Sequence, residues 1–311
     1  MAFTMHSHSG QFCPGHAKDQ LEAVVQHAIR IGYKTLGLTE HMPRTGLEDL
    51  YPEELDDPQA SLAVLMPRHD EYLLEAQRLQ AKYASQIHIL IGFEGEFIRA
   101  ATYAPLVQQL ASHPAIDYFI GSLHHTCGVP IDFDKAYYAK AREAAGGSEE
   151  QLYTHYYDEQ YAMLTTLQPR VVGHFDLIRL LSEEPERDLR TAWDGRVWAK
   201  VVRNLEAARQ GGGWLECNSS ALRKGLAEPY PTRAIAEEWL KMGGSFTLSD
   251  DSHGIAQVAT NYGRALDYLE SLGVKEVRTL QKDAEPNAPA SAKAVVKEVS
   301  VTIEDIRKSL A

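Results

Sequence analysis

The chain has 311 residues, of which 44% are hydrophobic and 24% charged, as in a folded globular protein with a large core. Its formal net charge of −12 argues against nucleic acid as a preferred partner, because binding to a phosphate backbone requires a basic surface. No apolar run reaches membrane-spanning length, and the three scattered cysteines are too few for a disulfide framework, so we expect a cytoplasmic protein.

Short apolar and β-branched runs alternate with amphipathic stretches along most of the chain. Strands are predicted at residues 3–8, 35–39, 87–92, 118–121, 170–173, 213–217 and 244–248. Helices are predicted near residues 17–32, 60–84, 103–112, 147–167, 194–210, 231–242 and 262–272. One helix after each strand predicts parallel strands joined by crossover helices. This number of units favours a closed barrel, although periodicity alone does not distinguish a barrel from an open sheet.

Two stretches between these elements are predicted to be long loops. Residues 43–60 are rich in proline and acidic side chains, and residues 182–194 have no clear periodicity. Loops of this length often act as lids in compact enzymes.

The C-terminal region follows a different pattern. Residues 284–292 predict an irregular linker, followed by a strand at 297–302 and a short helix. We therefore expect a single domain in which residues 1–280 form the α/β barrel. Residues 281–311 are then a linker with a short strand and helix that pack on it.

Potential metal ligands follow nearly every predicted strand. In chain order they are His6, His8, His16, Glu40, His41, Glu94, Glu96, His124, His125, His174, Asp176, Asp251 and His253. In a parallel barrel the carboxyl ends of the strands meet on one face, where active sites are built. Alternate residues of a strand point to the same side, so His6 and His8 can present two imidazoles to one ion. A carboxylate such as Glu94 can bridge two cations, and the joint pattern predicts a multi-metal site.

No role in metal binding is predicted for the remaining histidines. They lie within predicted helices or at the beginnings of strands, and they are His27, His69, His88, His113 and His155. We expect solvated or hydrogen-bonded imidazoles there, and we expect replacement of His69 to affect neither metal binding nor activity. His125 stays open, because on an extended chain it faces away from His124.

The residues around the proposed ligands resemble the ordered motifs of PHP-family histidinol-phosphate phosphatases, particularly those of the yeast-type branch. The matching stretches lie in order from residue 6 to about residue 254, some four-fifths of the chain. They include His6-Ser-His8, Cys13-Pro-Gly-His16, Glu40-His-Met-Pro-Arg44, Phe93-Glu-Gly-Glu-Phe97, Gly173-His-Phe-Asp-Leu-Ile-Arg179, Glu216-Cys-Asn-Ser-Ser-Ala-Leu-Arg223-Lys224 and Asp251-Ser-His253.

The resemblance implies a distorted (β/α)7, TIM-like barrel (the PHP fold) that hydrolyses L-histidinol phosphate to L-histidinol and phosphate in histidine biosynthesis. It implies three divalent metal ions, for which imidazole and carboxylate ligands suit zinc, iron or manganese. The implied ligands are His6, His8, His16, His41, Glu94, His124, His174, Asp251 and His253. Glu40 stands where aspartate is common in the family, so we assign it to substrate binding or ligand support instead.

For the reaction we expect a hydroxide bridging two metal ions to attack phosphorus in line with the leaving alkoxide. Negative charge on the phosphoryl group is stabilised by cationic side chains. Arginine suits this role because its guanidinium group can donate two hydrogen bonds to one phosphate. Arg179 and Arg223 are the candidates for this catalytic and substrate-binding role, and Lys224 is a further substrate-binding candidate.

Two other interpretations stay open. The same fold could act on a nucleotide, on the 3′ end of an oligonucleotide or on phosphotyrosine, although the acidic balance disfavours nucleic acid. The chain could also be a non-catalytic metal-binding module, but such a module is expected to lose ligands, and every motif position here is filled. The identity of the metals, the general acid and the oligomeric state do not follow from the sequence.

Overall fold

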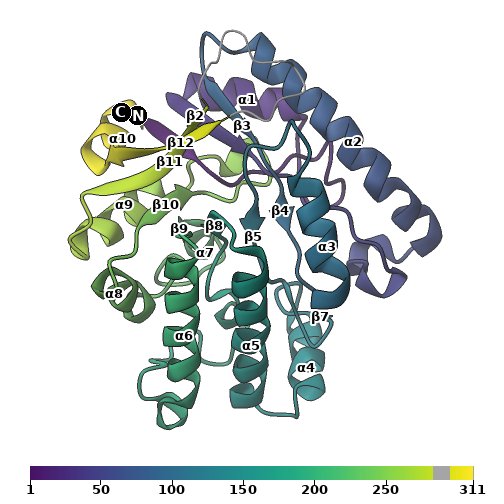
Figure 1. Ribbon diagram of the computed structural model, residues 1–311, viewed down its shortest axis with the longest axis vertical. Helices are drawn as coiled ribbons and strands as arrows, with labels where there is room; N and C mark the ends of the chain where they lie inside the picture. Colours follow the sequence, from purple (N-terminus) through teal and green to yellow (C-terminus); the bar gives the residue numbers. More distant parts are fainter. Residues whose placement is uncertain (283–294, 311) are drawn as a thin grey trace.

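The computed structural model describes residues 1–282 and 295–310, and its strands form two parallel sheets (Figure 1). One sheet has the order β1-β2-β3, with β1 at Ala2–Thr4, β2 at Tyr33–Leu38 and β3 at His88–Ile91. The other has the order β10-β9-β8-β5-β4, with β4 at Glu94–Gly95, β5 at Ile120–Gly121, β8 at Val171–Val172, β9 at Trp214–Asn218 and β10 at Phe246–Ser249. The predicted parallel α/β architecture is confirmed. The strand pairing divides it into two sheets and does not form one closed sheet.

Backbone hydrogen bonds join the two sheets at both of their junctions. Beyond β1, the Met5 N–H donates to the carbonyl of Leu248 in β10 at 3.1 Å. At the other junction, the Glu94 N–H of β4 donates at 3.1 Å to the carbonyl of Glu40, which follows β2, and a parallel bridge pairs His41 with Glu94. These contacts bring the carboxyl ends of strands from both sheets together.

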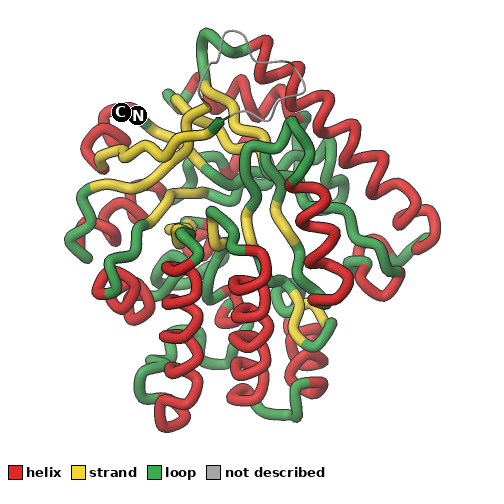
Figure 2. The backbone as a smooth tube through the Cα atoms, viewed as in Figure 1, coloured by secondary structure: helices red, strands yellow, loops and turns green. Residues whose placement is uncertain are grey.

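Helices lie outside the strands, which occupy the centre of the molecule (Figure 2). The helices near the predicted positions are α1 (Leu21–Arg30), α2 (Pro58–Lys82), α3 (Ala100–Ala111), α5 (Glu149–Leu167), α6 (Arg196–Gln210), α8 (Arg233–Lys241) and α9 (Tyr262–Ser271). In α1 the buried residues Leu21, Val24, Val25 and Ala28 recur at helical spacing and form one apolar stripe. None of the helices in the described part of the chain is long and apolar enough to cross a membrane.

Several short elements were not predicted. The helix α4 (Lys135–Ala144) buries only Tyr138 and Ala141, so its apolar stripe is narrow, and Asp134 caps it by accepting from the Tyr137 N–H at 2.8 Å. The others are the hairpin strands β6 (His125–Thr126) and β7 (Val129–Pro130), the one-turn helix α7 (Ser220–Arg223), and the 3-10 turns η1 (Leu47–Asp49), η2 (Pro52–Glu54), η3 (Leu177–Arg179), η4 (Ala192–Gly195) and η5 (Ile255–Gln257).

The C-terminal elements pack against the N-terminal ones. Strand β11 (Glu276–Lys282), which was not predicted, pairs antiparallel with β12 (Val296–Thr302), and α10 (Ile303–Leu310) then contacts β1. Strand β11 crosses the boundary proposed at residue 280. The predicted linker at 284–292 lies outside the described residues.

Candidate metal centre

Side chains that follow the strands of both sheets meet in one cluster. Glu94 comes from β4 itself, and the others follow the ends of β1, β2, β5, β8 and β10: His6, His8, His41, His124, His174, Asp251 and His253. All of them are buried except His41 and His253, which are partly exposed. A parallel bridge between Ser7 and Ser252 brings the first and last segments of this set together.

The cluster divides into three groups, two of which share His8, and within each group the ligand atoms lie within 4.8 Å of one another. The groups are His8, His41 and His253; His6, His8 and Asp251; and Glu94, His124 and His174. Eight of the proposed ligands therefore come together, as the sequence predicts. His16 belongs to none of these groups.

Glu94 lies between the histidines. Its Oε1 is 3.0 Å from Nε2 of His174 and 3.2 Å from Nε2 of His124. Its Oε2 is 3.1 Å from both Nε2 of His6 and Nδ1 of His41. The two oxygens thus face different sets of imidazoles, which is the arrangement of a carboxylate that bridges cations.

The carboxylate of Asp251 also lies near three of the histidines. Its Oδ1 lies 3.5 Å from Nε2 of His8, 3.7 Å from Nε2 of His6 and 3.6 Å from Nδ1 of His253. The Asp251 backbone has φ of 48°, in the left-handed region that aspartate rarely adopts. Such strained backbone is concentrated at functional sites, where it aims a side chain.

Several imidazole nitrogens in this cluster are buried without a hydrogen-bond partner. They include Nε2 of His6, both ring nitrogens of His8 and of His41, and Nε2 of His253. In addition, the Nε2 atoms of His124 and His174 lie only 3.1 Å apart. Buried polar atoms are nearly always paired, so this set of orphaned nitrogens beside two carboxylates fits divalent transition metals.

The buried carboxylates and imidazoles of this pocket shift one another's pKa values. Burial raises the pKa of Glu94, but His6 and His124 outweigh it and hold that pKa well below its usual value. Asp251 behaves in the same way, through burial opposed by His6 and His8. Burial lowers the pKa of His41 to about 3. The carboxylates are therefore anionic and His41 is neutral, whereas the same carboxylates, against burial, raise the pKa values of His6, His8 and His124, whose protons a bound metal would displace.

Two further buried carboxylates hold the histidine rings. Glu216 accepts from Nδ1 of His6 at 2.7 Å and from the backbone N–H of His174 at 2.8 Å. Glu96 lies 3.0 Å from Nδ1 of His124. Such partners fix the tautomer and orientation of a ligand imidazole. The sequence signal for Glu216 is an acidic residue within an otherwise apolar strand.

His16 lies at the rim of the cluster. Its side chain is 42% exposed, and its Nδ1 lies 3.2 Å from Oε1 of Glu53 in the loop before α2. Its ring centroid is 4.8 Å from that of His253, and it stacks on Tyr51. Tyr51, which sequence reasoning missed, donates from its hydroxyl to Glu96 at 2.9 Å and so ties this loop to the centre.

The three candidate cations occupy different surroundings. Lys224 lines a central cavity of about 430 Å³ together with Glu94, His174 and Asp251. Arg223 donates to the backbone carbonyls of Asp250 and Asp251 at 3.1 and 3.0 Å. Arg179 donates to the carbonyls of Glu228 and Pro229 at 2.8 and 3.0 Å and lies 3.1 Å from Asp176. Lys224 therefore reaches the cavity, whereas both guanidinium groups bond to protein atoms around it.

Comparisons with known proteins agree with this geometry. The family model described as "PHP domain" matches residues 4–220. A curated relative from Schizosaccharomyces pombe, named "Probable histidinol-phosphatase", is 41% identical, covering 97% of this chain and 95% of its own length. The "Histidinol-phosphatase" of Saccharomyces cerevisiae is 33% identical, covering 85% of this chain and 87% of its own.

A solved structure shows the same fold. It is that of a histidinol phosphate phosphatase from Lactococcus lactis, in complex with zinc, L-histidinol and phosphate. It superposes with a TM-score of 0.64 at 19% identity, covering 89% of this chain and 96% of its own. At this identity the likeness supports the fold alone.

Proposed function

The chain belongs to the PHP-domain family, and from this premise we propose that it is a metal-dependent phosphomonoesterase that hydrolyses L-histidinol phosphate to L-histidinol and phosphate. The observation that carries the proposal is the set of three ligand groups around Glu94 and Asp251. The relatives from both yeasts are named histidinol-phosphatases, and this chain matches them over most of their length. The Lactococcus lactis enzyme was solved in complex with zinc, L-histidinol and phosphate.

We extend the proposal to the details of the site. The ligand set is the nine residues implied by the family motifs. Eight of them form the three groups, and His16 at the rim is the ninth ligand. We propose three divalent ions, one for each ligand group, and we propose that the joined sheets form the distorted (β/α)7 barrel of this family. The three ligand groups and the hydrogen bonds between the sheets support these statements.

When bound, the metal ions supply Lewis-acid stabilisation of phosphate oxygens and activation of water. The chain's own residues prepare the site for this chemistry. Glu216 and Glu96 orient the rings of His6 and His124, and Arg223 holds the backbone of Asp251 in place. Lys224 places a positive charge in the central cavity for the substrate phosphate. Arg179 and Arg223 remain our candidates for further phosphate contacts.

Replacement of His8 by alanine tests the function and the site together. His8 belongs to two of the three ligand groups, so His8→Ala should lower the bound metal and abolish hydrolysis of histidinol phosphate. The measurements are metal content per chain and phosphate release from histidinol phosphate, a nucleotide and an aryl phosphate in parallel. The control is His155→Asn, at an exposed position of α5. Wild-type activity in metal-stripped His8→Ala protein would contradict the proposal.

A further inference from the structure

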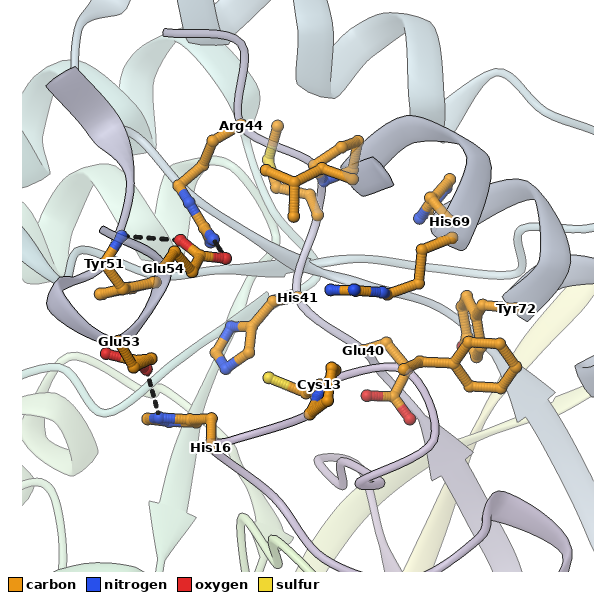
Figure 3. Close-up of a pocket in the computed structure, with 16 residues that line it drawn as sticks. Cys13, His16, Glu40, His41, Arg44, Tyr51, Glu53, Glu54, His69 and Tyr72 are labelled. Atoms are coloured by element: carbon orange, nitrogen blue, oxygen red, sulfur yellow. Dashed lines mark hydrogen bonds and ion pairs between the residues drawn. The ribbon is translucent and has the colours of Figure 1, made fainter. Parts of the chain in front are cut away.

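A side cavity adjoins the metal centre and shares His16 and His41 with it. It encloses about 570 Å³ of space, a volume that includes open solvent at its mouth. Figure 3 shows His41 in its middle, with Arg44, Tyr51, Glu53 and Glu54 of the loop before α2 on one side and His69 and Tyr72 of α2 on the other. A molecule at the metal centre can therefore extend past His41 into this side cavity.

Some charged groups in the wall of the side cavity neutralise one another. The Arg44 guanidinium pairs with Glu54 and lies over the Tyr51 ring at 4.4 Å. At the rim, Glu53 pairs with His16 at 3.2 Å. These pairs form part of the wall. A ligand would therefore be recognised by the remaining polar side chains.

Three polar side chains of the wall have unused hydrogen-bonding capacity. Glu40 is 2% exposed, and although its Oε1 accepts from Ser9 at 2.6 Å, its Oε2 has no partner. His69 is 5% exposed, and neither of its ring nitrogens has a partner. Arg68 lines the same cavity and makes no hydrogen bond or ion pair with residues 1–282 or 295–310. Buried polar groups left unpaired are unfavourable, so this combination indicates a ligand that completes them.

The complementary ligand follows from these three groups. The free carboxylate oxygen of Glu40 suits an ammonium group. A neutral heteroaromatic ring with one N–H donor and one acceptor nitrogen can donate to His69 and accept from Arg68. Glu40 offers an acceptor oxygen and Arg68 offers N–H donors, so the wall favours a ligand with separate donor and acceptor groups over a simple anion.

We propose that the side cavity binds the leaving-group half of the substrate, an amino alcohol that carries a heteroaromatic ring, with the ammonium on Glu40 and the ring between His69 and Arg68. This assignment rests on the proposed function and adds the residues that set its specificity. It also revises the expectation for His69, which sequence reasoning treated as a histidine without a role. His69 lies on α2, far in sequence from every proposed metal ligand, so its replacement separates substrate recognition from metal binding.

The test compares two substrates in the variants His69→Leu and Glu40→Gln. L-Histidinol phosphate carries the amine and the imidazole, whereas 4-nitrophenyl phosphate carries neither. In both variants we expect kcat/KM for histidinol phosphate to fall by about tenfold or more, the effect of losing a hydrogen bond to a charged or buried group. We expect a much smaller loss for the aryl phosphate, and unchanged metal content. L-Histidinol should also inhibit aryl phosphate hydrolysis less strongly in the variants than in the wild type.

The control variant is His155→Asn on the exposed face of α5, which should leave kcat/KM unchanged for both substrates. Equal fractional losses for the two substrates, or an unchanged inhibition constant for L-histidinol in both variants, would overturn the assignment. A failure of the proposed function has a different signature, because the wild-type protein would then hydrolyse 4-nitrophenyl phosphate but not histidinol phosphate.

Discussion

At the scale of single residues, the carboxylate of Glu216 contacts two proposed metal-binding histidines without belonging to a ligand group. It accepts from the His6 ring and from the His174 backbone, and it is fully buried. His6 compensates the burial that raises the Glu216 pKa and holds that pKa below its usual value. Glu216 therefore acts on the metals through the orientation and basicity of His6.

Replacement of Glu216 by glutamine should weaken metal binding while the fold persists. Glutamine keeps the size of the side chain but loses the charge that favours one tautomer of His6, and such changes lower metal affinity by about 10- to 100-fold. The measurement is metal retained against a competing chelator, with circular dichroism as the check on folding. Glu206→Gln, at a partly exposed position of α6, is the control. Unchanged retention in Glu216→Gln would show that Glu216 has only a structural role.

Glu159 of α5 gives a pH-dependent contribution to stability. Burial raises its pKa to about 7, and its carboxylate accepts from the Cys127 N–H at 3.0 Å. Because the folded pKa lies above the unfolded one, this contribution is present below about pH 4.5 and is lost as the pH rises through 7. Glu159→Gln is neutral in both states and keeps the acceptor. Its stability relative to wild type, from urea unfolding, should therefore be higher at pH 8 than at pH 5. A difference independent of pH would contradict the assignment.

At the scale of elements, strands followed by amphipathic helices were predicted because each buries a regular apolar pattern. Strand β10 fits this description, since Phe246–Ser249 is buried throughout. Helix α4 and strand β11 were missed because their patterns are weak, with several exposed positions in each. The stability of such elements comes from what they pack against, which the local pattern does not contain.

The C-terminal helix α10 should be an integral part of the folded domain. Ile306 is fully buried, and the Ser309 hydroxyl donates to the Gly32 carbonyl at 2.6 Å. We expect Ile306→Ala to lower the free energy of unfolding by about 2–5 kcal/mol, as for other large-to-small substitutions in cores. Urea unfolding measures this, and Lys308→Ala on the exposed face of α10 is the control. A loss no larger than that of the control would show that α10 is dispensable.

At the scale of the whole molecule, the proposed ligands extend from His6 to His253 and come from both sheets. A metal bound to them links segments that are far apart in the sequence and close in the fold. Since the unfolded chain does not hold these segments together, metals stabilise the native state by binding it selectively.

Removal of metal should therefore lower the melting temperature of the wild-type protein. Dialysis against a chelator is expected to lower Tm, and added zinc should restore it. In His8→Ala, which lacks a member of two ligand groups, the chelator should cause a smaller shift. Differential scanning calorimetry measures both effects, and a wild-type Tm unaffected by chelation would argue against a structural contribution from the metals.

The sequence by itself determined the parallel α/β architecture and most of the metal centre. The sequence was sufficient because the pattern is local. The polar residue that follows each buried strand must lie at the carboxyl end of that strand, and parallel strands bring those ends together. Eight of the nine proposed ligands meet in this way. The family motifs then supplied the reaction, which composition and spacing could not.

Only the tertiary structure decided which side chains support the ligands and which line the cavities. Glu216, Tyr51 and His69 contribute through neighbours distant in sequence, such as His6 for Glu216 and Glu96 for Tyr51. The same holds for the cations, since Lys224 reaches the central cavity while Arg179 and Arg223 bond to backbone carbonyls. These outcomes depend on how loops and helices pack over the strand ends, and residue spacing along one strand or helix does not record that packing.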